Sequence, residues 1–466
     1  MKIDYLEKMR SGEKLNLKEQ IRLVLRLSVP AILAQISTII MEYIDASMVG
    51  NLGADASAAI GIVSTTTWLI GGLCSAIGIG FTVGIAHRIG AKKEREARAY
   101  VKTGLVTVVL FACLLALIAV AIHRQLPLWM GGNQALQKSA SQYFLVFALT
   151  LPIMQVNYTG AGMLECSGNM KLPSVINIAM CALDVLFNML FIYIMKMGVL
   201  GAAIGTMCAQ ICGAVCVLLG ILVFSDKLSI RKEEKEWMKL TQWASAIRMS
   251  LPVMLSSLIM GSAYVVSTRI VAPLGNVAIS ANSFAITAES LCYMPGYGIA
   301  HAATTLVGQA KGAENARLEK RFACLTTAIG IFVMSMTAVL LYLFAPEMIA
   351  IMSPDSGVRE LGTRILRIEA FAEPMFGASI VVEGVLRGMG RTGIPSALNL
   401  ASMWCVRLPL SALVARTFGL VGVWSVMCGE LCFRGTIFLV AMLFLFQKKV
   451  DKSKSIYYNN NVGRQE

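Results

Sequence analysis

Long apolar stretches recur along almost the whole chain, and they constrain its fold more than any other feature. Predominantly apolar windows of 20 or more residues are centred near residues 37, 70, 112, 153, 184, 211, 260, 292, 333, 375, 405 and 433. As a helix, each window can cross a hydrocarbon core of about 30 Å. Lipid cannot satisfy exposed backbone groups, and the alternation of barrel strands is absent. The sequence therefore predicts an all-α polytopic membrane protein with twelve transmembrane helices.

Charged residues are few and unevenly placed. They make up 15% of the chain, whereas soluble domains carry about 25%. If the N-terminus is cytoplasmic, the segments on that side hold 31 of the 41 lysines and arginines. The positive-inside rule therefore places both termini in the cytoplasm. The net charge of +14 is thus an orientation signal, and we expect membrane lipid and no nucleic acid as a partner.

The two halves of the chain repeat each other at an offset of 222 residues, without a gap from Ser28 to Asn177. The coincident pairs are Pro30 with Pro252, Gly53 with Gly275, Gly90 with Gly312, Pro152 with Pro374, Gly162 with Gly384, Gly168 with Gly390, Pro173 with Pro395 and Asn177 with Asn399. A repeat of this size is typical of transporters. Six spans per half put both halves in the same orientation. The sequence therefore predicts two parallel six-helix lobes around a central cleft.

The hydrophilic segments give the expected domain boundaries. Residues 1–26 form a basic amphipathic segment, interpreted as a helix lying on the cytoplasmic membrane surface. The N-lobe spans residues 27–224, a cytoplasmic linker spans 225–246 and the C-lobe spans 247–447. Residues 448–466 form a polar cytoplasmic tail that we expect to be disordered.

Motifs for enzyme or metal chemistry are missing from the sequence. No G-x-x-x-x-G-K-[ST] phosphate loop occurs, and the three histidines are scattered. The cysteines fall in spans without paired C-x-x-C motifs, so we expect no metal site, no cofactor and no enzyme activity. The G-x-x-x-G pattern at Gly201 and Gly205 is interpreted as close helix packing.

Four motifs occur in order on this doubled frame. D-x-x-x-V-G-x-L-G spans Asp45–Gly53, GVLGAAIGT spans Gly198–Thr206, ATTLVGQAKGA spans Ala303–Ala313, and GVLRGMGRTGIP spans Gly384–Pro395. Together they resemble the multidrug and toxic compound extrusion (MATE) family, nearest its bacterial DinF-like and Firmicutes-type branches, over residues 17–447. The resemblance implies a cation-coupled antiporter in the inner membrane that exports amphipathic, often cationic compounds by alternating access. We expect a functional monomer. The rivals are a flippase for lipid-linked precursors or polysaccharides, then an integral-membrane enzyme, then a channel.

Acidic residues inside the first span are candidates for the coupling site. A charge at the bilayer centre costs about 2.5–3.5 kcal/mol on insertion scales, so a retained acid is a functional candidate by default. Asp45 matches the first-helix aspartate of the family, which implies a role in proton or ion coupling. The alternative is a structural carboxylate bonded to a neighbouring helix. Glu42 lies one turn earlier and could share a cation with Asp45 or point to another helix.

Asp184 and Asn188 lie four residues apart in the fifth span and therefore share a helix face. In DinF-like relatives the pattern is an asparagine followed by an aspartate, so this chain carries the two in swapped order. Asp45, Asp184 and Asn188, with Glu42, form the predicted cation site. Gln35 and Asn177 are possible supporting partners, although Asn177 is equally compatible with plain interhelical hydrogen bonding.

The second half offers fewer candidates for coupling. The seventh span has no acid and the tenth has no clean match to the sodium-coupled branch, which favours a proton over sodium as the coupling ion. Glu289, before a predicted break at 294–296, Glu373 and Met260 are possible substrate-cleft residues. Glu430 with Arg434 and Glu383 with Arg387 are spaced by four residues and are predicted to form internal ion pairs.

Overall fold

The structure is a computed structural model that describes residues 5–11, 13, 15–130, 134–229 and 237–462. These residues form helices and connecting turns, with no strand among them. The N-lobe contains α2 (Leu17–Gly50), α3 (Ala54–Ile77) with α4 (Ile79–Gly90), α5 (Glu94–Ile122), α7 (Gln134–Cys166), α8 (Lys171–Asn188) with the π-helix η1 (Met189–Ile194), and α9 (Gly198–Leu222). The C-lobe contains α10 (Leu240–Val271), α11 (Asn276–Gly312), α12 (Ala316–Met352), α13 (Ser356–Glu369) with α14 (Glu373–Gly388), α15 (Gly393–Ala401) with the π-helix η3 (Ser402–Arg407), and α16 (Leu408–Val462).

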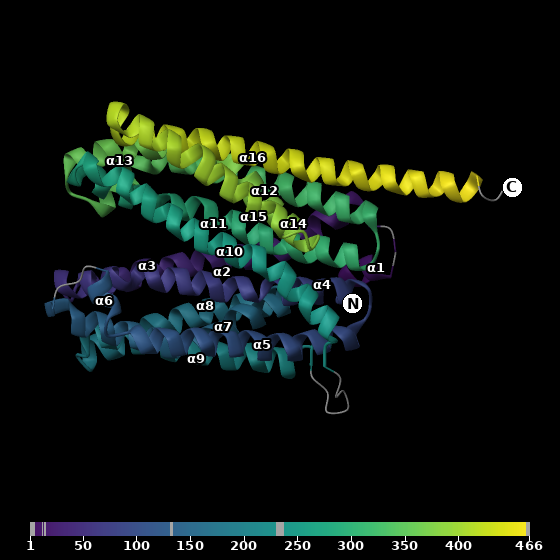
Figure 1. The fold of residues 1–466 in the computed structure, drawn as a ribbon, viewed down its shortest axis with the longest axis horizontal. Coiled ribbons are helices and arrows are strands. Elements are labelled where there is room, and N and C mark those ends of the chain that lie inside the picture. The colour runs from purple at the N-terminus through teal and green to yellow at the C-terminus, as the bar shows by residue number, and fades with distance from the viewer. Residues whose placement is uncertain (1–4, 12, 14, 131–133, 230–236, 463–466) are drawn as a thin grey trace.

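The predicted twelve crossings in two lobes are confirmed. Nine stretches of the described residues are long and apolar enough to span a membrane. The last of them, residues 393–447, makes two crossings because Gly419, with φ 58°, interrupts α16. The helix α11 and the pair α13–α14 supply the other two crossings. Figure 1 shows the lobes as two layers of roughly parallel helices, with both chain termini at the same end.

The lobes meet closely where α4 crosses α11, and the contact follows the sequence repeat. A Cβ atom on Gly308 would lie 2.9 Å from the Cβ of Ala86, its partner at the offset of 222. A Cβ on Gly90 would lie 2.1 Å from the carbonyl oxygen of Gln309, and one on Gly312 would lie 1.9 Å from that of His87. These two contacts are also equivalent in the repeat. An approximate two-fold axis therefore passes between α4 and α11.

Hydrogen bonds between the lobes gather near the end of the bundle that carries α1 (Tyr5–Arg10), here called the terminal end. The Nε2 atom of His87 lies 2.7 Å from the carbonyl oxygen of Gly388, and Gln309 Nε2 donates to the carbonyl of Cys166 at 2.8 Å. These two bonds are equivalent in the repeat, because residues 87 and 309 differ by 222, as do residues 166 and 388. The same symmetry therefore operates in packing and in hydrogen bonding.

The two ends of the chain differ from the expectation. The helix α1 packs against the protein, because Leu6 and Met9 are buried and Arg10 donates to Ser167 and Gln309 of opposite lobes. The second part of the segment belongs to α2, which begins at Leu17 and leaves Leu17, Ile21 and Leu25 exposed. Beyond residue 447, α16 continues as a helix to Val462 where a disordered tail was predicted. Residues 230–236 of the predicted linker lie outside the described residues.

Replacement of Gly312 by alanine tests the backbone contact between the lobes. The new methyl group would overlap the carbonyl of His87, and neither backbone can move without displacing a helix. We expect G312A to lower the free energy of unfolding by about 1–3 kcal/mol, as overpacking does elsewhere. Thermal unfolding of the purified protein measures this loss.

Gly429 is the matched control, because a Cβ there meets no atom within 4 Å. G429A should leave the melting temperature unchanged or raise it, as alanine is the better helix former. Equal melting temperatures for G312A and the parent chain would contradict the close contact.

Candidate functional site

The structure brings together the three residues that the sequence placed at the cation site. Asn188 on α8 donates through Nδ2 to Asp45 Oδ1 on α2 at 2.9 Å and to Asp184 Oδ2 at 3.1 Å. Asp184 and Asn188 are each 1% exposed, whereas Asp45 is partly exposed. One amide nitrogen thus links two carboxyl groups that lie between the second and eighth helices.

Two acceptor atoms of this cluster have no donor. Asp184 Oδ1 and Asn188 Oδ1 are buried and make no hydrogen bond in the described structure. A buried polar atom without a partner costs about 1–3 kcal/mol. No lysine or arginine pairs with Asp45 or Asp184 among the described residues. Among the described residues, the cluster therefore lacks a positive charge to offset its carboxyls and a donor for its two buried acceptor atoms.

A close helix approach makes the cluster possible. A Cβ atom on Gly205 of α9 would lie 2.1 Å from Asn188 Oδ1, so only glycine leaves room for this amide. Gly201, one turn earlier, faces the carbonyl oxygen of Phe191 in η1 in the same way. The packing role predicted for this G-x-x-x-G pattern is confirmed. Its functional consequence, the placement of Asn188, could not be derived from sequence because the pairing of α8 with α9 was unknown.

A cavity of about 520 Å³ lies beside the cluster within the N-lobe. Glu42, whose side chain is exposed, is the only charged residue among the described residues that line it. Aromatic and small polar side chains make up much of the remaining wall, including Trp68, Tyr143, Phe147, Thr150, Tyr158 and Thr206. Thr206 also lies beside Asp184, so it connects the cavity wall to the buried carboxyl. Glu42 therefore faces the cavity while remaining one turn from Asp45.

Gln35 and Asn177 are not in contact with the carboxyl cluster. Gln35 lies ten residues before Asp45, which is about 15 Å along a helix at 1.5 Å per residue. Asn177 donates to Thr38 Oγ1 at 3.4 Å and accepts from Cys181 at the same distance. The bond to Thr38 joins α2 to α8, so Asn177 performs the interhelical role that the sequence left open.

The three C-lobe candidates lie away from the N-lobe cavity. Glu289 and Glu373 are 6% and 1% exposed and lie within reach of each other's charge, together with the fully buried Glu369. Both carboxyl oxygens of Glu369 and of Glu373 lack hydrogen-bond partners in the described structure. Met260 packs against Met403 and its neighbours. Sequence reasoning missed this acidic group, because Glu369 and Glu373 share a face only across the α13–α14 junction.

Two further sequence expectations have definite outcomes. The helix α11 runs without interruption through Pro295, so the break predicted at 294–296 is wrong. It packs against α12, α14 and α2. Both predicted ion pairs are confirmed, since Arg434 Nη2 lies 2.6 Å from Glu430 Oε1 and Arg387 contacts Glu383. In the described structure, no group of three or more His, Cys, Asp or Glu side chains is arranged to hold a metal ion.

Replacement of Asn188 by alanine tests the amide bridge. The buried Asp184 and the partly exposed Asp45 would lose their common donor, so we expect N188A to lower the free energy of unfolding by about 1–3 kcal/mol. N177A is the control, because Asn177 makes only long bonds with Thr38 and Cys181 and does not touch the carboxyls. Thermal melts of the two variants should differ clearly. A larger loss in N177A than in N188A would contradict the assigned bridge.

Known proteins resemble this chain over nearly its full length. The probable multidrug resistance protein NorM of Thermotoga maritima is 22% identical over 441 residues, which cover 92% of this chain and 93% of that protein. Multidrug and toxin extrusion protein 1 of Mus musculus is 26% identical over 463 residues, which cover 96% of this chain and 79% of that protein.

The fold is likewise similar to solved structures. A MATE transporter from Vibrio cholerae superposes with a TM-score of 0.87 at 18% identity, over 95% of this chain and 98% of that one. The family model MatE matches residues 30–194 and 252–413, which lie one in each repeat. Because these matches take in more than half of the sequence and both lobes, the chain belongs to the MatE family.

Proposed function

We propose that this protein is an ion-coupled antiporter that exports amphipathic, often cationic compounds, with a proton rather than sodium as the coupling ion. The observation that carries the proposal is the pair of carboxyls, Asp45 and Asp184, held by one amide with no basic partner. Two carboxylates in one dry site repel each other, and a bound cation removes that repulsion. A proton on Asp184 would also convert an acceptor without a partner into a donor.

The adjacent cavity supports a cationic or neutral cargo. Its wall combines aromatic faces with the single charge of Glu42, and aromatic faces attract organic cations. A flippase for lipid-linked phosphate compounds would need positive charge there, so the cavity disfavours that alternative. Because Glu42 lies one turn from Asp45, cargo and coupling ion would compete for one region of negative charge. Competition of this kind is what exchange requires.

Alternating access is the mechanism that we propose for this exchange. The lobes are joined near the terminal end by the bonds of His87 and Gln309, whereas Asp45 is partly exposed towards the other end. With both termini in the cytoplasm of a bacterial inner membrane, this arrangement closes the cytoplasmic side. One chain encloses the cavity, so we propose that the monomer is the working unit. We also propose that the protein is a transporter and not an enzyme. Reconstitution at one copy per vesicle would test the monomer.

Dye accumulation in inside-out vesicles tests the coupling site. With wild-type protein, a pH gradient should drive accumulation of a cationic dye, and a sodium gradient alone should not. D45N and D184N should each reduce the pH-driven rate to near the level of empty vesicles, because the carboxyl can no longer bind a proton. The initial rate of fluorescence quenching measures this effect.

E373Q serves as the comparison, since it neutralises a buried acid of the C-lobe. It should retain pH-driven accumulation if coupling belongs to the N-lobe. Normal rates in D45N and D184N together with loss in E373Q would move coupling to the C-lobe. Accumulation that follows only sodium would overturn the proposed ion.

A further inference from the structure

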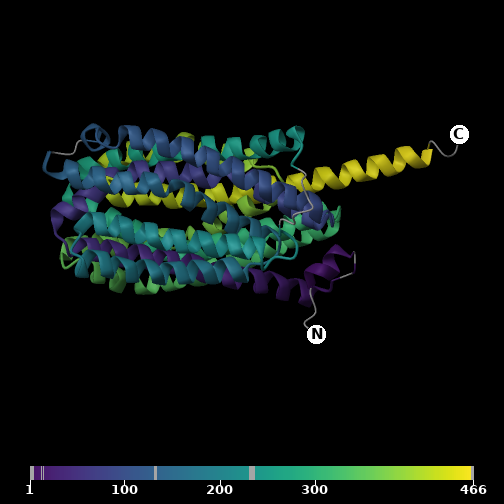
Figure 2. The same ribbon diagram turned by 90° about the horizontal axis from the view of Figure 1, so that it is seen from below.

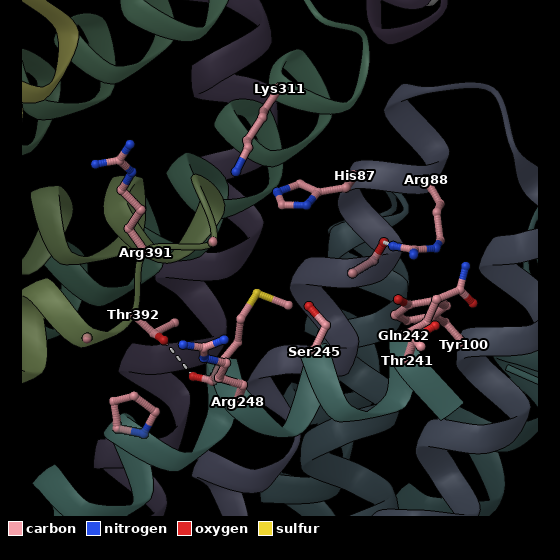
Figure 3. Close-up of a pocket in the computed structure, with 15 residues that line it drawn as sticks. His87, Arg88, Tyr100, Thr241, Gln242, Ser245, Arg248, Lys311, Arg391 and Thr392 are labelled. Atoms are coloured by element: carbon pink, nitrogen blue, oxygen red, sulfur yellow. Dashed lines mark hydrogen bonds between the residues drawn. The ribbon is translucent and has the colours of Figure 1, made fainter. Parts of the chain in front are cut away.

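A second cavity, of about 600 Å³, lies at the terminal end between the lobes. Its wall carries His87 and Arg88 from α4, Arg248 from α10, Lys311 from α11 and Arg391 from the turn between α14 and α15. No aspartate or glutamate is among the described residues that line it. Figure 3 shows these side chains entering from elements of both lobes. The cavity thus concentrates positive charge at the junction of the two lobes.

Hydrogen bonds fix the walls of this basic cavity. His87 bonds to the carbonyl of Gly388, and Lys311 donates to the carbonyl of Met389. Thr392 Oγ1 donates to the carbonyl of Met249 at 2.6 Å, a bond drawn in Figure 3. The turn at 388–392 is therefore tied to α4, α11 and α10. A ligand would meet a preformed site and would not have to order these elements.

The sequence repeat shows that the scaffold does not need this charge. At the offset of 222, Arg88 corresponds to Ala310, Lys311 to Ile89 and Arg391 to Asn169. Three cations of the basic cavity thus have neutral partners at the equivalent place in the other half. Arg248 alone has a basic equivalent, Arg26.

The equivalent place is a smaller cavity of about 280 Å³, whose lining includes the acidic Asp226 as well as basic side chains. There α1 lies against the turn at Gly168, and Leu6 and Arg10 line the space together with Arg26. Arg10 donates to the carbonyl of Ser167, the repeat equivalent of the Met389 carbonyl that receives Lys311. With α1 in place, the chain leaves only a small cavity on one side of the two-fold axis. On the other side the cavity is about twice as large and no acidic residue is among the described residues that line it.

We propose that the basic cavity binds a phosphate group, which bridges the two lobes at the terminal end. Guanidinium groups match phosphate oxygens with paired hydrogen bonds, and several cations close together repel one another until an anion binds. Arg88 already pairs with Glu96 at 3.5 Å, whereas Arg248 and Arg391 are exposed and form no ion pair within the described structure. These two side chains are free to reach the anion.

The phosphate could belong to a lipid headgroup or to a soluble compound. Leu251 and Leu255 follow Arg248 at helical spacing and are 58% and 54% exposed. They form an apolar stripe along which an acyl chain could lie below the charged rim. A soluble phosphate would use the same cations without this stripe. In both cases the bound group would stabilise the arrangement in which the terminal ends of the lobes meet.

Thermal unfolding of the full-length protein in neutral detergent tests this site. One arm adds phosphatidylglycerol, with phosphatidylcholine as its control. The other arm adds inorganic phosphate, with chloride at the same ionic strength as its control. We expect the phosphate-bearing probe to raise the melting temperature saturably. In the double variant R248Q/R391Q the half-saturating concentration should rise by about tenfold or more, because two charge-assisted contacts are lost.

Two further variants make the test specific. R88Q changes the N-lobe side of the cavity and should weaken the shift less than the double variant does, because Arg88 is already paired with Glu96. R321Q removes an exposed arginine of α12 outside the cavity and should change nothing. A shift with phosphatidylglycerol alone supports a lipid headgroup, and a shift with inorganic phosphate supports a soluble ligand. Equal shifts in all variants, or no shift with either probe, would overturn the proposal.

Discussion

The contact between α4 and α11 is the constraint on which the remaining structure depends. Backbone meets backbone at Gly90 and Gly312, with no side chain between them. Dispersion forces are strongest at such short separations, and small residues allow helices to approach closely within a membrane. The paired bonds of His87 and Gln309 are arranged around the same axis. The repeat is therefore a physical relation in the folded protein as well as a relation in the sequence.

Polar groups break this symmetry in different ways in the two lobes. In the N-lobe two carboxyls share one amide and have no cation beside them. In the C-lobe Glu430 is held between Arg407 and Arg434, while Glu369 and Glu373 remain without partners. Both arrangements lie near a π-helical segment, η1 or η3, where the regular helical bonding is disturbed. The two repeat-related lobes thus pair their acidic residues differently, and we propose that this difference assigns ion coupling to one lobe.

The sequence predicted the fold well, because apolar length and repeat spacing are one-dimensional signals. Asp45, Asp184 and Asn188 could also be grouped, since spacing along each helix indicates a shared face. The C-lobe acidic group and the basic cavity depend on which helices pack together. The spacing of residues within one helix does not predict that packing. Glu369 and Glu373 are separated by a helix junction, and the basic cavity takes residues from five separate segments. Gln35 failed as a partner because distance along α2 outweighs similarity of residue type.

The docking of α1 has a practical consequence for anyone who makes this protein. Arg10 bonds to both lobes, so a fusion that displaced α1 would break contacts at the seam between them. Figure 2 shows α16 running clear of the bundle at the opposite end of the chain. An affinity tag or fluorescent reporter is therefore better attached at the C-terminus, where it adds mass without crowding the seam that the first helix closes.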